Sequence, residues 1–227
     1  MAAGDAGCPG RRSSLTVGSA SEFLFDEADV DDLDLELKGE YAAFLEETGL
    51  DVLRPGQQIE FTLPGKPREA RLHITALGLY EASVNGQPAH DSVFAPGWTI
   101  YDKRVRYQSW DVTALLRKGQ NALGVILGDG WYCGHVGTNN RQNYGDRPKL
   151  LAQLEWVAAD GQRGLLTTEA EWRWSTGPFL ENDLIMGEAH DARRESAGWD
   201  APGFDDSGWR TACVAEVPEI EIEPHYG

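Results

Sequence analysis

The sequence predicts an all-β fold, an antiparallel β-sandwich or jelly roll with an irregular acidic N-terminal extension. Short runs in which polar and apolar residues alternate recur about every ten residues, as strands buried on one face require. The 26 glycines and 11 prolines supply the many turns of such a fold, and the 8 Trp, 7 Tyr and 7 Phe can fill its core. Only one brief helical turn is expected within the strand region.

Composition divides the 227 residues into four parts. Residues 1–20 are small and polar, which is typical of a disordered tail. Residues 21–56 form an acidic extension whose structure the pattern does not determine. The β-sandwich is expected over residues 57–217, and residues 218–227 are expected to form a C-terminal tail or linker.

The acidic extension holds most of the negative charge of the chain. Between Glu22 and Asp51, 12 acidic residues stand against the single basic Lys38, which accounts for −11 of the formal net charge of −17. The apolar residues of this stretch follow neither a helix period nor a long strand alternation. Residues 38–48 could form a short helix that ends at Gly49.

Strand patterns begin near residue 57 and continue to the aromatic pair Trp172 and Trp174. Most of them alternate polar and apolar residues, whereas residues 122–127 are a continuous apolar run that is typical of a central strand. The predicted strands are residues 58–63, 70–75, 79–84, 103–110, 122–127, 150–156 and 163–168, with a further short strand at Trp172 and Trp174.

Turn residues separate these strands. Asn85-Gly86 favours a tight hairpin because both residue types tolerate positive φ, and Asp160-Gly161 gives a second hairpin signal. Asp111 is a good N-cap for one helical turn over residues 112–117, which Gly119 is expected to end.

The composition also disfavours several classes of partner and cofactor. A net charge of −17 argues against nucleic acid and against anionic membranes, since both attract clustered Lys and Arg. No run of 18 apolar residues is present and residues 1–16 lack a secretory signal, so a cytoplasmic location is expected. The three cysteines and five histidines show no metal-ligand spacing, and neither a metal nor a cofactor is expected.

A series of motifs follows in a fixed order over residues 68–215. In this order and spacing, the series resembles the N-terminal β-sandwich domain of bacterial α-L-rhamnosidases, a galactose-binding-like sandwich; the first 65 residues show no such resemblance. The motifs are ARLHITALGLYEASVNG (70–86), APGWT (95–99), VRYQ (105–108), WDVT (110–113), GVILGDGWY (124–132), YGDRP (144–148), LLAQL (150–154) and GFDDSGW (203–209).

The resemblance implies that the chain has no catalytic residues of its own. In that family the hydrolytic carboxylates belong to a separate (α/α)6 barrel, for which this sequence offers no matching positions. The expected partner is therefore a catalytic barrel domain or protein. A rhamnose-binding module of these enzymes holds calcium with an Asp-Asn pair, and the matching residues here are Leu77 and Gly78, whose side chains have no oxygen to coordinate calcium.

The first candidate site is the GDGWY motif, which follows the central strand. On an exposed loop, the rings of Trp131 and Tyr132 could stack on a sugar and Asp129 could accept hydroxyl hydrogen bonds. The structural alternative is a tight turn, in which Gly128 and Gly130 supply unusual φ angles and Trp131 caps the core.

Three further groups of residues are candidates. Trp98 in a turn could stack on a ligand or cover an end of the sandwich. The polar loop near residue 143 could contact carbohydrate or dock a catalytic domain, or its Asp and Arg could pair locally. Asp205 and Asp206 are adjacent at a turn and do not suit glycoside hydrolysis, which needs two opposed carboxyls. The candidates in the polar loop are Asn143, Tyr144, Asp146 and Arg147.

Three functions stay open, in order of preference. The first is a non-catalytic accessory domain of an α-L-rhamnosidase-type glycoside hydrolase, inactive by itself. The second is a structural or interaction protein in which residues 22–51 cover the face that a barrel would occupy, so that removing residues 1–56 exposes an apolar patch. The third is a free carbohydrate-binding module that recognises rhamnose-containing glycans.

Overall fold

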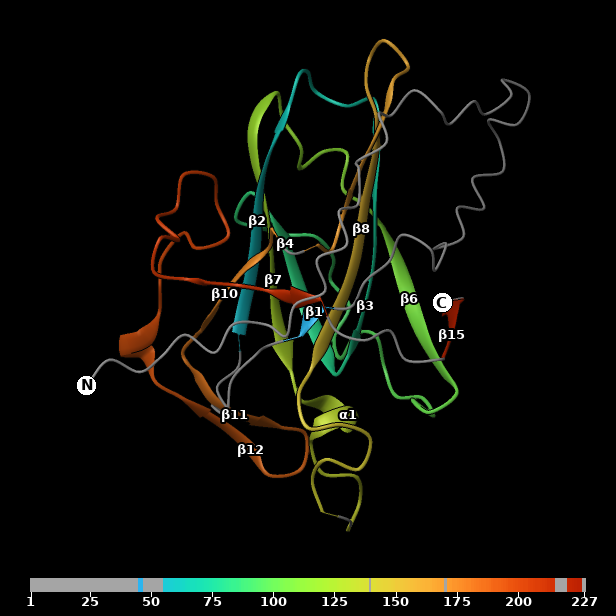
Figure 1. Cartoon of the computed structure of the whole chain (residues 1–227), viewed down its shortest axis with the longest axis vertical. Coiled ribbons are helices and arrows are strands. Elements are labelled where there is room, and N and C mark those ends of the chain that lie inside the picture. Colours follow the sequence, from blue (N-terminus) through green and yellow to red (C-terminus); the bar gives the residue numbers. More distant parts are fainter. Residues whose placement is uncertain (1–44, 47–54, 139, 170, 215–219, 226–227) are drawn as a thin grey trace. The chain divides into compact units, whose positions relative to one another are not determined.

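The computed structural model describes residues 45–46, 55–138, 140–169, 171–214 and 220–225, and these residues form an all-β domain (Figure 1). Two sheets of short strands face each other, and a two-stranded ribbon lies apart from both. The predicted fold class is therefore confirmed. Within this described part, no helix is long and apolar enough to span a membrane.

The first sheet has the strand order β14-β1-β8-β3-β6-β15, with β9 also paired to β8. All its pairs are antiparallel except β15 with β6, which are parallel. Residues 221–224, which were expected to belong to a tail or linker, are thus part of the sheet. The strands are β1 (Leu45–Glu46), β3 (Glu69–Leu77), β6 (Arg104–Asp111), β8 (Lys149–Val157), β9 (Arg163–Thr167), β14 (Cys213–Val214) and β15 (Glu221–Pro224).

The second sheet has the order β13-β10-β2-β7-β4-β5 and is antiparallel throughout. Its strands are β2 (Pro55–Leu63), β4 (Leu79–Val84), β5 (Gln87–Pro88), β7 (Gly119–Gly128), β10 (Arg173–Thr176) and β13 (Arg210–Thr211). The separate ribbon pairs β11 (Phe179–Asp183) with β12 (Gly187–His190). The helical elements are a single turn, α1 (Gly130–Cys133), and a 3-10 turn, η1 (Ala192–Arg194).

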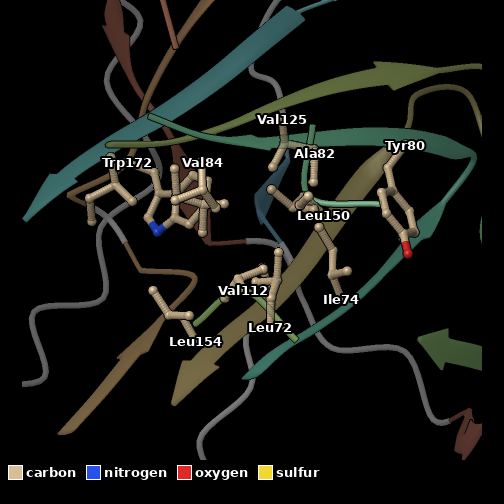
Figure 2. Close-up of a cluster of buried hydrophobic side chains, with 14 of the residues drawn as sticks. Leu72, Ile74, Tyr80, Ala82, Val84, Val112, Val125, Leu150, Leu154 and Trp172 are labelled. Atoms are coloured by element: carbon tan, nitrogen blue, oxygen red, sulfur yellow. The ribbon is translucent and has the colours of Figure 1, made fainter. Parts of the chain in front are cut away.

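The main core lies between the two sheets. Alternate residues of each strand point inward, as the pleat of a β-strand requires. Figure 2 shows Leu72 and Ile74 of β3 and Leu150 of β8 on the same core as Ala82 of β4 and Val125 of β7. Tyr80, Val84, Val112, Leu154 and Trp172 complete the part of the core drawn there.

The continuous apolar run of β7 is explained by cover on its second face. Gly124 lies where Trp199 and Asp200 cross the strand, and a Cβ on Gly124 would lie 2.7 Å from Asp200 Cβ and 2.9 Å from the Trp199 ring. Leu123 and Val125 meanwhile belong to the core. A strand buried on both faces has no polar alternation, which is why its sequence is uniformly apolar.

A second apolar cluster lies on the outer face of the first sheet. Its buried residues alternate along the strands with residues of the main core, so they face away from that core. The cluster is covered in part by α1 and by the segment at residues 220–222. Its members are Leu77, Tyr101, Val105, Tyr107 and Leu151, with Trp131, Tyr132, Tyr144, Ile220 and Ile222 packed against them.

The predicted hairpins are confirmed, whereas the helical turn over residues 112–117 is wrong. Asn85 and Gly86 have φ values of 54° and 76°, and they join β4 to β5. Asp111 does accept a hydrogen bond from the Thr113 N–H at 3.0 Å, but the chain continues as a turn. Thr113 Oγ1 accepts a hydrogen bond from the Ala70 N–H at 2.8 Å and donates one to the Ala70 carbonyl at 3.3 Å. These bonds hold the segment against β3.

The expectations for the N-terminal part lie largely outside the described residues. Residues 1–20, and nearly all of residues 21–56, fall there. Within the predicted helix 38–48, only Leu45 and Glu46 are described. They form strand β1, so the helix prediction is wrong at these two residues.

Candidate functional site

Most of the predicted site residues meet at one end of the sandwich, which we call the α1 end. It comprises Asp129, the helical turn α1, the described residues of the loop 134–148 (134–138 and 140–148) and the turn between β11 and β12 (Figure 1). Asp129 and α1 lie at this end because β7 ends at Gly128 and the chain turns at once into α1.

Glycine at two positions makes this turn possible. Gly130 has φ +52°, and a Cβ there would lie 2.8 Å from Leu79 Cγ. Gly128 is packed against the Asn182 side chain, whose Oδ1 would lie 2.9 Å from an added Cβ. The GDGWY motif therefore forms a tight helical turn and not the open loop of the first interpretation.

Trp131 and Tyr132 are half-buried on this helical turn. Both pack against the second apolar cluster, and the Tyr132 ring meets Tyr101 edge-on at 5.2 Å. The Tyr144 ring also meets the Tyr101 ring edge-on, at 5.1 Å. Burial raises the pKa of the Tyr101 hydroxyl, so this ring stays neutral. These aromatics cover a core, as the structural alternative for Trp131 required.

Asp129 is tied to the polar loop by an ion pair. Its side chain is only 3% exposed, and its Oδ2 accepts a hydrogen bond from Arg141 Nη2. A buried carboxylate needs such a partner because desolvation of an isolated charge is costly. The pair therefore joins the end of β7 to the loop at residues 134–148.

A second polar pair, between His135 and Asp183, was not expected from the sequence. Asp183 Oδ2 accepts a hydrogen bond from the His135 N–H at 2.8 Å and lies 3.0 Å from His135 Nδ1. Burial raises the pKa of Asp183, but hydrogen bonds from the turn amides and from His135 outweigh it and hold the pKa well below its usual range. The pair connects α1 to the β11–β12 ribbon.

The other loop candidates make local contacts. Asn143 Nδ2 donates to the Asn140 carbonyl, and Arg147 Nη2 lies 3.1 Å from Asp146 Oδ2. Asp146 is 65% exposed, and its hydrogen bond with Arg147 lowers its pKa. This is the local pairing that the sequence allowed for. Both contacts join residues of the same loop.

Trp98 lies on a neighbouring loop, residues 89–103, between β5 and β6. It is 56% exposed, whereas Tyr101 of the same loop is buried and donates from its hydroxyl to the Gly97 carbonyl at 3.3 Å. Tyr101 also contacts Tyr132 and Tyr144, so it connects this loop with the α1 end. The exposed apolar neighbours of Trp98, which sequence reasoning missed, are Val93, Phe94 and Ile100.

The acidic residues of the GFDDSGW motif serve a turn. Asp205 Oδ1 accepts the Ser207 N–H at 3.1 Å, and Asp206 lies 3.9 Å from Arg173 Nε. Both residues thus lie at the turn that the sequence predicted, and Asp205 stabilises it. Leu77, at one of the two positions aligned with calcium ligands, is buried in the second apolar cluster. Among the described residues, no three His, Cys, Asp or Glu side chains are grouped as a metal site would need.

Comparison with known proteins identifies a family for most of the chain. The profile described as the alpha-L-rhamnosidase N-terminal domain matches residues 65–226. An alpha-L-rhamnosidase of Streptomyces avermitilis is 50% identical over 163 residues, which is 70% of this chain but 16% of that protein. This chain thus spans less than a fifth of that relative.

Solved structures agree with the sequence comparison. The crystal structure of Streptomyces avermitilis alpha-L-rhamnosidase complexed with L-rhamnose has a TM-score of 0.73 and 47% identity, over 75% of this chain and 17% of that one. Native alpha-L-rhamnosidase from Aspergillus terreus has a TM-score of 0.73 and 39% identity, over 80% of this chain and 22% of that one. In each case the match covers a β-rich part of a much longer polypeptide.

Proposed function

This chain belongs to the alpha-L-rhamnosidase N-terminal domain family, and from this membership we propose that it is a non-catalytic accessory domain that docks on and supports a rhamnosidase catalytic domain. The observation that carries the proposal is the extent of the match. It includes most of the β-sandwich described above but only 16% of the Streptomyces avermitilis relative. The remaining five-sixths or so of such a protein supplies a partner of ample size.

The carboxyl groups of the described residues support a non-catalytic role. Glycoside hydrolysis needs two opposed carboxyls, one of which has a raised pKa so that it can act as an acid. Hydrogen bonds lower the pKa values of Asp111, Asp146, Asp183, Asp191 and Asp205, whereas burial raises that of Glu155. The groups that act on it are Gln153 and Arg163, and neither is a carboxylate. Glu155 also lies within strand β8, where it pairs with Arg71 of β3 and Leu165 of β9.

The α1 end supports the same proposal. Asp129 is held by Arg141, Asp183 is held by His135, and the aromatic rings pack on an apolar cluster. These side chains fix the loops relative to the sheets. Each of these side chains thus has a partner within the domain, as a structural role in a scaffold requires.

Two preparations test the proposal. The chain alone should release no rhamnose from an aryl α-L-rhamnoside above the buffer rate. A chimera in which the chain replaces the matched 163-residue segment of the Streptomyces avermitilis enzyme should be active, whereas the enzyme lacking this segment should lose activity or melt at a lower temperature. Turnover by the repurified chain alone, or an enzyme indifferent to loss of the segment, would contradict the accessory role.

A second candidate function, glycan binding, is favoured by one observation. Trp98 is an exposed aromatic ring on a loop, and such rings stack on the apolar faces of sugars. Titration with L-rhamnose up to ~10 mM, where the binding free energy is only ~3 kcal/mol, should change Trp fluorescence in the wild type but not in Trp98→Ala. If the Trp fluorescence of neither protein changes, glycan binding through Trp98 is wrong.

A further inference from the structure

The loop at residues 89–103, which we call the apolar loop, exposes an unusual set of side chains. Four of the eight large hydrophobic residues that are exposed within the described chain lie in an eight-residue stretch of it. Long loops without regular structure are uncommon in compact domains and often serve binding. The exposed fractions are 78% for Val93, 59% for Phe94, 56% for Trp98 and 51% for Ile100.

Buried residues hold the apolar loop in place. A chain of hydrogen bonds runs from Trp110 Nε1 to Tyr80 OH at 3.0 Å, and from that hydroxyl to Gln108 Oε1 at 2.9 Å. Gln108 Nε2 then donates to the Pro96 carbonyl at 3.1 Å, and the Tyr80 N–H donates to Ala95 at 2.9 Å. Since Tyr80 and Gln108 come from different sheets, the middle of the loop is fixed to both.

The backbone of the apolar loop is also held in a fixed conformation. Phe94 has φ +58°, in the left-handed region that bulky residues rarely adopt, and yet its side chain is exposed. The Gly97 N–H donates to the Phe94 carbonyl at 2.8 Å and closes the turn. Strain of this kind persists where the surrounding structure enforces it, and it is common at binding surfaces. The loop is therefore pre-organised with its apolar side chains outward.

The chemistry of the loop distinguishes among possible occupants. A sugar uses one aromatic face and needs polar groups beside it, whereas residues 93–100 carry no charged side chain and one hydroxyl, that of Thr99. The centre of a protein interface, in contrast, combines aromatic and aliphatic side chains and lacks charge. A catalytic domain in the same polypeptide would also meet the loop at high effective concentration.

We propose that the apolar loop is the surface through which this domain docks on the catalytic domain of its rhamnosidase. The inference rests on the proposed function and specifies its contact. Val93, Phe94, Trp98 and Ile100 are the residues that insert into an apolar face of that domain. The buried hydrogen-bond chain through Tyr80 and Gln108 positions them.

The test compares two sets of four substitutions in the chimera described above. The loop variant carries V93S, F94N, W98S and I100S, with Asn at 94 because Asn tolerates a left-handed backbone. The control variant carries L165S, I185S, M186S and V214S, which are the other four exposed large hydrophobics of the described chain. Trp98→Ala serves as a milder second variant of the loop. All three variants of the isolated chain are checked for folding by circular dichroism.

The loop variant of the chimera should melt about 5 °C or more below the wild-type chimera, and Trp98→Ala should show part of this loss. The control variant should melt within ~2 °C of the wild type. Hydrogen exchange of residues 93–100 should be slower in the chimera than in the chain alone. Equal melting of loop and control variants would overturn the inference. So would a dimer of the isolated chain that the loop variant abolishes, or protection of the loop by L-rhamnose.

The two proposals fail in different ways. If removal of the whole matched segment leaves the Streptomyces avermitilis enzyme unchanged, the accessory function itself is wrong. If that removal destabilises the enzyme while the loop variant of the chimera behaves like the control variant, only the assignment of the docking surface is wrong.

Discussion

At the scale of single residues, His73 shows how burial determines protonation. It lies on β3 with Nδ1 2.6 Å from Ser109 Oγ, and its ring packs edge-on against Tyr107. Burial, with a smaller contribution from the charge of Arg71, lowers the pKa of His73 to about 4. The sequence places this histidine on a strand, but only the structure shows that it is buried there.

This low pKa predicts a pH dependence of stability. Because the pKa of His73 is lower in the folded state than in the unfolded chain, protons bind preferentially to the unfolded state once the pH falls below 6.5. The stability that the fold keeps while His73 is neutral is complete above pH 6.5, and it is lost as the pH falls toward about 4. Between pH 6.5 and 4.5 we expect a loss of about 2 kcal/mol in the free energy of unfolding from this group.

Urea unfolding at several pH values measures this loss, and His73→Gln is the reference because carboxyl groups also titrate in acid. The wild type should lose more stability than the variant between pH 6.5 and 4.5. Parallel curves for the two proteins would show that the histidine is not buried in its neutral form.

The two Asp–Arg pairs near the α1 end give a matched prediction. Asp129 is 3% exposed and paired with Arg141, whereas Asp146 is 65% exposed and paired with Arg147. Asp129→Asn should lower the free energy of unfolding by about 1–3 kcal/mol because it leaves the partly exposed Arg141 without its buried anionic partner. Asp146→Asn should change it by less than about 0.5 kcal/mol, since an exposed pair contributes little.

Chemical denaturation at pH 7 compares these two variants directly. The two variants share the substitution and the type of partner, and the aspartates differ strongly in burial. A similar small loss in both would mean that the Asp129–Arg141 pair does not hold the polar loop to the end of β7.

At the scale of elements, Gly124 in the centre of β7 has no space for a larger side chain. An added methyl group would meet Asp200 Cβ at 2.7 Å and the Trp199 ring at 2.9 Å, which forces the covering segment away from the strand. We expect Gly124→Ala to destabilise the fold by about 1–3 kcal/mol. Gly65→Ala is the control, because no atom lies within 4 Å of its added Cβ and its φ is not positive.

Thermal unfolding followed by circular dichroism measures both glycine variants. Gly65→Ala should be neutral or slightly stabilising, since alanine restricts the unfolded chain. A Gly124→Ala protein as stable as the wild type would show that the segment around Trp199 does not pack on β7.

Strands could be predicted from the sequence where one face is buried and the other is not. The pattern of residues 79–84 gave β4 with its observed bounds, because buried and less buried residues alternate along it. The ribbon of β11 and β12 was missed because it belongs to neither sheet and has no fully buried residue. Its sequence therefore carries no alternation to detect.

The sequence grouped most of the candidate residues in one stretch of the chain, residues 129–147, but did not predict their interactions. Local signals found Asp129 and the aromatic turn after it, since glycines beside a buried strand mark a tight turn. The partner of Asp183 is His135, which is 48 positions away in the chain, and a link between two loops leaves no periodic signal. The partner of Asp129 was likewise assigned only by the structure.

At the scale of the whole molecule, the sheet depends on a strand from the part of the chain that carries most of the charge. Residues 1–51 hold 13 acidic and 3 basic residues, so −10 of the net charge of −17 lies there. Within them, strand β1 (Leu45–Glu46) pairs with both β8 and β14. The acidic extension is thus joined to the sandwich by backbone hydrogen bonds at these two residues.

Two truncations separate the role of this strand from that of the residues before it. Removing residues 1–36 leaves β1 in place, and this protein should stay monomeric with the stability of the full chain. Removing residues 1–51 deletes β1 and leaves Leu150 and Val214, which both pair with Leu45, on open strand edges. Open edges pair readily with other chains, so this protein should be less stable and should self-associate. Light scattering after size-exclusion chromatography, with thermal unfolding of the same samples, distinguishes the two. Association of the shorter truncation as well would mean that residues 1–36 cover an apolar face, and two monomers of equal stability would show that β1 contributes nothing to the sheet.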